Sequence, residues 1–202
     1  MKKVLILGGS GLVGYTLVKK FKEYNWSVST LTFQRKVEEA DETIYLDLSN
    51  AFSFNAIPDP STFDLVVNSI AITDVKSNEV RFNEAFTLHV ELSRYLAIRS
   101  LKYVYISTVA VYSETLDNDK NVNLSLKNWY SKTKFFGEPN SRHLTLRINV
   151  IGLESLTKRS LLEWAFDNLK KNNEITGFEN QFINPVLPIH VFEVIIKYAE
   201  EL

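Results

Sequence analysis

The sequence predicts an α/β fold built on a doubly wound parallel sheet, and three observations lead to this prediction. An apolar run at Val4–Leu7 ends at Gly8, the first of several glycines spaced three residues apart, and a helical pattern follows at once. Short apolar runs then alternate with longer helical patterns along most of the chain. Several runs are nearly continuous in Val, Ile and Leu, which is typical of strands covered by helices on both faces.

The individual elements follow from these runs and patterns. Strands are expected at Lys3–Leu7, Ser27–Thr32, Thr43–Leu46, Leu65–Asn68, Tyr103–Ser107 and Leu144–Ile148. Helices are expected at Leu12–Tyr24, Val80–Ser100, Trp129–Glu138, Ser160–Asn172 and Val191–Leu202. A proline-rich loop spans Asn55–Ser61, and the polar stretch Glu114–Leu126 is read either as a lid beside a binding site or as a plain solvated connection.

Composition excludes several classes of function. The chain has 202 residues and a net charge of −1 at pH 7, so we expect neither nucleic acid nor an anionic membrane surface as partner. It has no cysteine, which excludes disulfides, thiol catalysis and cysteine-ligated metals, and we expect no metal site. No apolar run approaches the ~18 residues that a membrane span needs. Because glycines interrupt the first apolar run, it does not read as a signal peptide, and we expect a cytoplasmic protein.

The glycine-rich turn predicts a dinucleotide ligand. Gly8, Gly11 and Gly14 would allow a sharp turn, the close approach of a phosphate and tight packing of a helix on a strand. The helix that follows offers unpaired N–H groups and the positive end of its dipole to a pyrophosphate. A turn of this kind without any ligand is the alternative.

The end of the second strand bears on the choice of cofactor. A carboxylate there would bind the adenosine ribose hydroxyls and favour NAD, but this chain has Arg35 and Lys36 instead. A guanidinium matches a 2′-phosphate well, so NADP is preferred and NAD remains possible. The alternative is that both cations decorate a surface turn. After the third strand, Asp47 and Leu48 could bind and cover the adenine, or Asp47 could simply cap a turn.

A possible catalytic group lies further along the chain. Thr108 follows the fifth strand, and Tyr130 and Lys134 are spaced four apart, so they share one face of the next helix. A tyrosine titrates near ~10 in water, but a neighbouring lysine and an oxidised nicotinamide would lower its pKa and make proton transfer practical near pH 7. Thr108 could bind the same substrate oxygen. The three scattered histidines, His89, His143 and His190, are expected to be structural.

Together these residues resemble the extended short-chain dehydrogenase/reductase family, and within it the dTDP-4-dehydrorhamnose reductase group. Four segments carry the resemblance: the glycine motif Gly8–Gly14, the pair Asp47–Leu48, the strand end Val67–Thr73 and the helix start Tyr130–Glu138. Phe82–Asn83 and Leu146–Arg147 resemble further family segments. The resemblance implies a Rossmann-type domain, here 1–150, and a much reduced C-terminal substrate-side segment, 151–202, packed on it.

The resemblance also implies roles for individual residues. Thr108, Tyr130 and Lys134 would be the catalytic trio, with Tyr130 as proton donor, Lys134 on the nicotinamide ribose and Asn83 as support for Lys134. The cofactor would be bound by Gly8, Ser10, Gly11, Leu12, Gly14, Arg35, Lys36, Asp47, Leu48, Ile70, Ala71 and Lys134. The implied substrate is a nucleotide sugar, and a homodimer is one assembly that the resemblance allows.

Departures from the reductase pattern leave three functions open. Val109 stands where the reductase group has a carboxylate, and Ser107–Tyr112 is closer to the pattern of the epimerases. The chain is also shorter than is usual in the family. We therefore expect an NADP-dependent reductase of a keto group on a nucleotide sugar, with a nucleotide-sugar epimerase and a non-catalytic dinucleotide-binding regulatory protein as alternatives.

Overall fold

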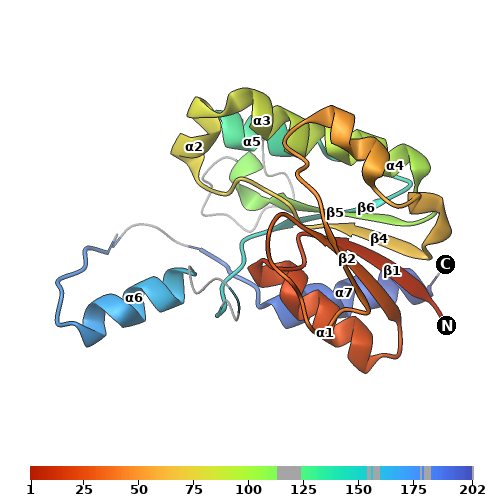
Figure 1. Ribbon diagram of the computed structural model, residues 1–202. Helices are drawn as coiled ribbons and strands as arrows, with labels where there is room; N and C mark the ends of the chain where they lie inside the picture. The colour runs from red at the N-terminus through yellow and green to blue at the C-terminus, as the bar shows by residue number, and fades with distance from the viewer. Residues whose placement is uncertain (113–123, 154–155, 157–159, 178, 180–182, 202) are drawn as a thin grey trace.

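The computed structural model describes residues 1–112, 124–153, 156, 160–177, 179 and 183–201 (Figure 1). Within these ranges the strands form one six-stranded sheet of order β3-β2-β1-β4-β5-β6, and every neighbouring pair is parallel. The strands are β1 (Lys3–Leu7), β2 (Ser27–Thr32), β3 (Glu42–Tyr45), β4 (Leu65–Asn68), β5 (Tyr103–Thr108) and β6 (Leu144–Ile148). The predicted doubly wound sheet is confirmed, with β3 beginning one residue earlier than expected.

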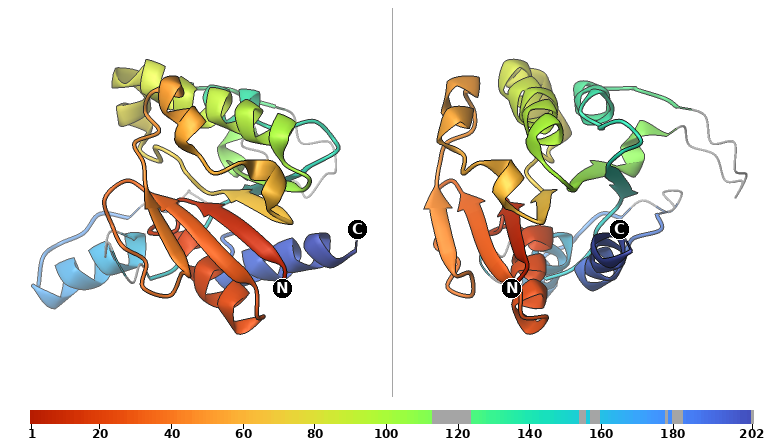
Figure 2. Two further views of the ribbon diagram at one scale, coloured as in Figure 1. Left: turned by 45° about the vertical axis from the view of Figure 1, so that its right-hand side comes forward. Right: turned by 90° about the vertical axis from the view of Figure 1, so that its right-hand side faces the viewer.

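One face of the sheet is covered by two helices that are far apart in sequence, α1 (Leu12–Glu23) and α7 (Pro188–Glu200) (Figure 2). They meet at Phe21 and Phe192, whose ring centroids lie 5.1 Å apart in an edge-to-face contact. Both side chains belong to the buried core beneath β1 and β4. The helix α7 begins at Pro188, three residues earlier than predicted, because proline suits the first position of a helix.

The opposite face carries α2 (Val75–Val80), α3 (Phe82–Phe86), α4 (Leu92–Arg99) and α5 (Trp129–Phe136) (Figure 2). We predicted one helix over Val80–Ser100. The structure instead has a separate turn of helix before Arg81, and it has a π-helical segment, η3 (Thr87–Glu91), between α3 and α4. Short 3₁₀ turns, η1 (Ala51–Ala56), η2 (Pro60–Thr62) and η4 (Val109–Val111), complete the connections described.

After β6 the chain leaves the sheet edge and later returns to it. Val150 and Val186 form a parallel bridge, which leads the chain into α7. Between them, α6 (Leu161–Lys170) projects away from the sheet in Figure 1 and buries none of its residues. Phe166, for example, is 65% exposed. Most of the predicted loop Glu114–Leu126 lies outside the described residues. No helix in the described part of the chain is long and apolar enough to cross a bilayer.

Candidate functional site

The predicted cofactor residues lie along one edge of the sheet. Each group directly follows the carboxyl end of a parallel strand: Asp47 and Leu48 follow β3, Arg35 and Lys36 follow β2, Gly8–Gly14 follow β1, Ile70 and Ala71 follow β4, and Thr108 ends β5. The sheet order β3-β2-β1-β4-β5 sets these groups side by side in that sequence. The order reverses between β1 and β4, and ligands of open α/β sheets bind at such a switch point.

The glycine turn has the geometry that a phosphate site needs. Gly8 has φ +86°, a conformation that side chains rarely adopt. A Cβ on Gly14 would lie 2.2 Å from the carbonyl oxygen of Gly8, so close packing excludes any side chain there. At Gly11 the nearest atom to a Cβ would be that same oxygen at 3.4 Å, an ordinary contact. The protein itself therefore tolerates a side chain at Gly11, and this residue precedes the N-terminus of α1, which has no side-chain cap.

The adenosine end of the expected site carries two cations that have partners within the protein. The Arg35 guanidinium donates to the carbonyl oxygen of Leu156, and Lys36 Nζ lies 2.8 Å from a carboxylate oxygen of Glu38 on the surface. Asp47 Oδ1 accepts a 2.9 Å hydrogen bond from the Ser49 amide, which lowers the pKa of Asp47. Leu48 is buried in the core. Asp47 thus caps a turn, and its side chain is exposed.

Thr108 and Tyr130 meet where β5 ends and α5 begins. Thr108 lies close enough to Tyr130 to lower the pKa of the phenol, which partly offsets the burial that raises it. Asn128 holds the start of α5, because its side chain accepts from the Ser131 amide at 2.8 Å and forms a capping box with that residue. The pKa of Tyr130 is raised overall, so this phenol is protonated at neutral pH. The lowering expected from the sequence depends on an oxidised nicotinamide beside the ring.

Lys134 lies one turn along α5 and is 1% exposed. Its Nζ donates to the carbonyl oxygen of Ile106 at 2.7 Å and lies 4.2 Å from the centroid of the Tyr105 ring. Burial lowers the pKa of Lys134 to about 7, while the nearby Glu138 carboxylate acts in the opposite direction. Asn83, expected to support Lys134, is exposed on α3. In this structure the ammonium is therefore held by β5.

An ion pair fixes the end of α5 against the sheet. Arg147 on β6 donates to both carboxylate oxygens of Glu138, from Nε at 2.9 Å and from Nη2 at 2.7 Å. Its Nη1 donates to the Tyr112 hydroxyl at 2.8 Å, and Ser107 donates to Glu138 at 2.7 Å. Such a bidentate pair is geometrically specific. It therefore fixes the helix that carries Tyr130 and Lys134 relative to the strand end that carries Thr108.

The loop after β4 is fixed by side-chain hydrogen bonds that the sequence did not predict. Asn68 accepts from the Ile70 amide at 3.1 Å, and Asn78 donates to the carbonyl oxygens of Ile72 and Asp74 at 2.7 Å each. The Ile72 amide donates to His89 Nε2 at 3.0 Å. No local pattern identifies these residues, because their partners depend on how the elements pack. The backbone expected to lie against a cofactor is therefore held in one conformation.

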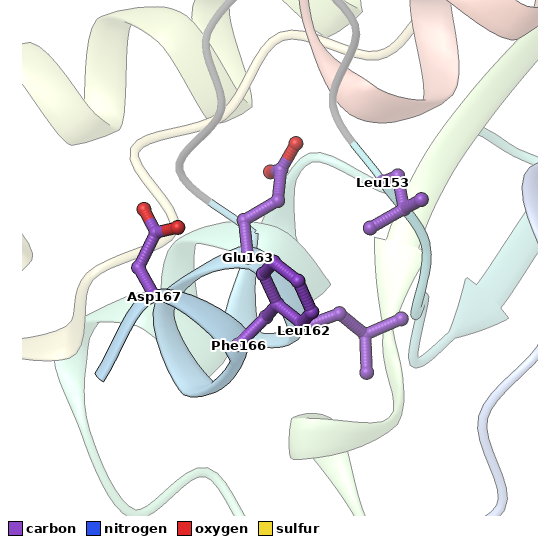
Figure 3. Close-up of a pocket in the computed structure, with 5 residues that line it drawn as sticks. All are labelled: Leu153, Leu162, Glu163, Phe166 and Asp167. Atoms are coloured by element: carbon purple, nitrogen blue, oxygen red, sulfur yellow. The ribbon is translucent and has the colours of Figure 1, made fainter. Parts of the chain in front are cut away.

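A pocket of about 420 Å³ lies beside α6 (Figure 3). Leu153, Leu162 and Phe166 form its apolar lining, and Glu163 and Asp167 add carboxylates. It is separate from the residues at the sheet edge predicted to bind a cofactor. Among the described residues, no three His, Asp or Glu side chains come together to hold a metal ion.

Comparison with solved structures supports the fold. A dTDP-4-dehydrorhamnose reductase from Clostridium acetobutylicum superposes with a TM-score of 0.77 at 22% identity, over 98% of this chain and 70% of that chain. The UDP-glucose 4-epimerase of Thermotoga maritima, solved with UDP-glucose, superposes with a TM-score of 0.80 at 16% identity, over 98% of this chain and 73% of that chain. MoeE5, solved with UDP-glucose and NAD, superposes with a TM-score of 0.81 at 16% identity, over 98% of this chain and 72% of that chain. These likenesses show that the chain shares the fold of sugar-nucleotide enzymes such as this reductase and this epimerase.

Sequence comparison identifies the family. The spore coat polysaccharide biosynthesis protein SpsK of Bacillus subtilis is 31% identical over 144 residues, which are 68% of this chain and 47% of that protein. The chain therefore spans about half the length of this relative. The family described as the RmlD substrate binding domain matches residues 1–202. With the parallel sheet, the glycine turn and the Tyr130–Lys134 helix in place, the chain belongs to the RmlD substrate-binding domain family, within the extended short-chain dehydrogenase/reductases.

Proposed function

We propose that this chain carries the active site of an NADP-dependent reductase that acts on a keto group of a nucleotide sugar. The observation that supports this most is the meeting of Thr108 and Tyr130 at the sheet edge, with Lys134 one turn further along α5. Family membership supports the substrate class, because relatives include a dTDP-4-dehydrorhamnose reductase and proteins solved with UDP-glucose.

The residues present fit a dinucleotide. The space at Gly11 and the uncapped start of α1 suit a pyrophosphate, and NADPH bound there would supply the hydride. Thr108 then orients the substrate carbonyl by a hydrogen bond to its oxygen. Tyr130 donates its phenolic proton to that oxygen, and its raised pKa keeps this proton in place near pH 7. Lys134 binds the nicotinamide ribose and supplies positive charge near the phenolate left behind.

The preference for NADP rests on Arg35 and Lys36. No carboxylate stands at the end of β2, where NAD-binding relatives of this fold place one on the ribose hydroxyls. The Arg35 guanidinium, which now donates to the backbone of Leu156, would turn to the 2′-phosphate. A planar guanidinium pairs well with phosphate oxygens.

A nucleotide-sugar epimerase is the second candidate, and Val109 favours it. This residue begins η4 directly after Thr108, in the place where a reductase-like carboxylate would stand. An epimerase oxidises and re-reduces the same carbon, so its cofactor shows no net change. The same trio would serve both reactions.

One experiment separates these possibilities. Purified protein is mixed with NADPH and a 4-keto nucleotide sugar, and separately with NADP⁺ and a 4-hydroxy nucleotide sugar. The absorbance of the reduced cofactor and the configuration of the sugar are followed in both mixtures. A reductase oxidises NADPH in proportion to the keto sugar. Inversion of the hydroxy sugar without net oxidation identifies an epimerase. Tight cofactor binding with neither reaction, across a panel of sugars, would overturn both proposals and leave a binding protein.

A further inference from the structure

His89 has an unusual place among the buried side chains of the described residues. It lies on the π-helical segment η3 and is 0% exposed. Both of its ring nitrogens have partners inside the protein: the Ile72 amide at 3.0 Å from Nε2, and the Thr133 hydroxyl at 2.8 Å from Nδ1. Its ring also meets the edge of the Tyr130 ring, with centroids 6.0 Å apart and planes at 76°. One side chain thus joins the loop after β4 to α5.

The partners determine which nitrogen of His89 carries the proton. The Ile72 amide can only donate, so Nε2 must be the acceptor and Nδ1 must carry the hydrogen. Nδ1 then donates to Thr133 Oγ1, whose own proton goes to the carbonyl of Trp129 or Tyr130. Protonating Nε2 would break the bond to Ile72. Burial, together with the nearby Lys134 charge, lowers the pKa of His89 to about 2, so the ring is neutral at neutral pH.

The backbone of His89 is fitted as closely as its ring. Its carbonyl oxygen accepts from the Tyr105 hydroxyl of β5 at 3.0 Å. A Cβ on Gly137, which ends α5, would lie 1.9 Å from that oxygen. Only glycine therefore allows the end of α5 to pack this closely against the His89 carbonyl. Residue 89 therefore contacts α5 at Thr133 and at Gly137, one turn apart. π-helical insertions often occur where a function needs one residue re-aimed.

We propose that His89 is a positioning residue that sets the Tyr130–Lys134 helix against the loop that lies along the cofactor. The proposal rests on the proposed function, because that function assigns Tyr130 to the substrate and Ile70–Ala71 to the cofactor. A shift of about 1 Å between the two would separate the hydride donor from the proton donor, which costs on the order of a hundredfold in rate. His89 acts through Ile72 and Thr133 and need not touch the ligands itself.

Substitutions can remove the two ring bonds separately. The amide of His89→Asn reaches the place of Nδ1 and keeps a donor for Thr133, whereas the longer His89→Gln places an acceptor near Ile72. His89→Leu keeps bulk and removes both bonds. His143→Leu is the matched control, because His143 is 9% exposed and its Nε2 bonds to the carbonyl oxygen of Ala97 at 2.8 Å. It contacts neither Tyr130 nor the β4 loop in any interaction described here.

The readouts are kcat and KM on a keto nucleotide sugar, the Kd for NADPH, the free energy of unfolding, the ¹⁵N resonances of the histidine rings and the ring resonances of Tyr130. We expect His89→Leu to lower kcat at least tenfold more than His143→Leu, with Asn and Gln between Leu and wild type. We also expect His89 to show a neutral Nδ1–H ring from pH 5 to 8. An equal loss of kcat in the two leucine variants would overturn the proposal.

The NMR measurements distinguish a failure of this proposal from a failure of the proposed function. If no sugar is reduced, the proposed function fails, whereas the histidine resonances and the NADPH affinities of the variants are still measured. Two outcomes would then overturn the positioning role. One is a His89 ring that titrates near 6.5. The other is His89→Leu binding NADPH as tightly as wild type with the Tyr130 resonance unchanged. A static neutral ring, with a Tyr130 resonance shifted in His89→Leu and unshifted in His143→Leu, would support it.

Discussion

At the scale of single residues, Gly11 and Gly14 illustrate two different reasons for a glycine. Gly14 is required by the fold, since a Cβ there would collide with the backbone of Gly8 at 2.2 Å. Gly11 has only an ordinary 3.4 Å contact and an extended φ of −85° that any residue adopts. The protein's own packing therefore does not require glycine at position 11. In the proposed site, the pyrophosphate would require glycine there, because its oxygens approach the backbone closely.

This difference predicts opposite outcomes for two alanine variants. The free energy of unfolding of Gly11→Ala should lie within about 1 kcal/mol of the wild-type value, which is the size of a change at a helix N-cap. This variant should bind NADPH at least tenfold more weakly. Gly14→Ala should lower the free energy of unfolding by several kcal/mol, because the added methyl group overpacks the site. Chemical denaturation and a fluorescence titration with NADPH measure both effects. A Gly11→Ala protein with wild-type affinity would place the pyrophosphate elsewhere.

Arg35 carries the choice between the two nicotinamide cofactors. Arg35→Ala should weaken NADPH by about tenfold or more, because a charge-assisted hydrogen bond to a phosphate is lost. NADH lacks that phosphate and serves as the internal control. Its affinity should change by less than twofold in the same titration. Equal losses for the two cofactors would reject the 2′-phosphate role.

Lys134 predicts a pH dependence of stability. Burial lowers its pKa in the folded protein to about 7, against ~10.4 in an unfolded chain. Between these values the unfolded state holds more protons, so the contribution of this side chain to stability rises with pH. The free energy of unfolding of wild type minus that of Lys134→Met should therefore increase from pH 7 to 9.5, by at most about 1.4 kcal/mol per pH unit. Lys132→Met, which removes an exposed lysine from the same helix, is the control, and a slope no steeper than this control would contradict the prediction.

At the scale of elements, the sequence predicted what depends on local pattern. The six strands were placed to within a residue, because runs such as Val4–Leu7 and Leu65–Val67 are buried on both faces and carry no polar interruption. The break at Arg81 and the π-helical segment were missed. A π insertion shifts the helical register by one residue, and an apolar pattern with several polar residues does not reveal that shift. The bonds of His89 were missed because both partners come from other elements.

Two helices with similar caps provide a test at this scale. Asn128 caps α5 and Ser160 caps α6, each in a capping box. α5 buries Ser131, Thr133 and Lys134, whereas α6 buries none of its residues. Asn128→Ala should therefore cost about 1 kcal/mol of global stability and also reduce turnover, because Tyr130 lies in the first turn. Ser160→Ala should leave the global unfolding transition within ~0.3 kcal/mol of wild type, since α6 frays separately. Comparable losses in denaturant melts would mean that α6 is coupled to the core.

At the scale of the whole molecule, the sheet order explains why separate motifs form one site. Asp47, Arg35, Gly11, Ile70 and Thr108 are spread over the 98 positions from Gly11 to Thr108, and β3-β2-β1-β4-β5 sets their strand ends in a row. The repeating strand and helix pattern predicted a doubly wound parallel sheet, and right-handed crossovers leave few alternatives for the order that the structure shows. The pattern did not predict the raised pKa of Tyr130 or the hydrogen bond of Lys134 to Ile106, since burial and contacts depend on packing.

The central claim is that Tyr130 donates the proton in a reduction at this sheet edge, and Tyr130→Phe tests it most directly. The substitution removes one oxygen and keeps the ring beside His89. NADPH oxidation with a 4-keto nucleotide sugar and the Kd for NADPH are measured on wild type and variant together. We predict a kcat lowered by about 10²–10⁴, the typical contribution of a positioned acid, and a Kd unchanged within twofold. Turnover by Tyr130→Phe at the wild-type rate would contradict the account.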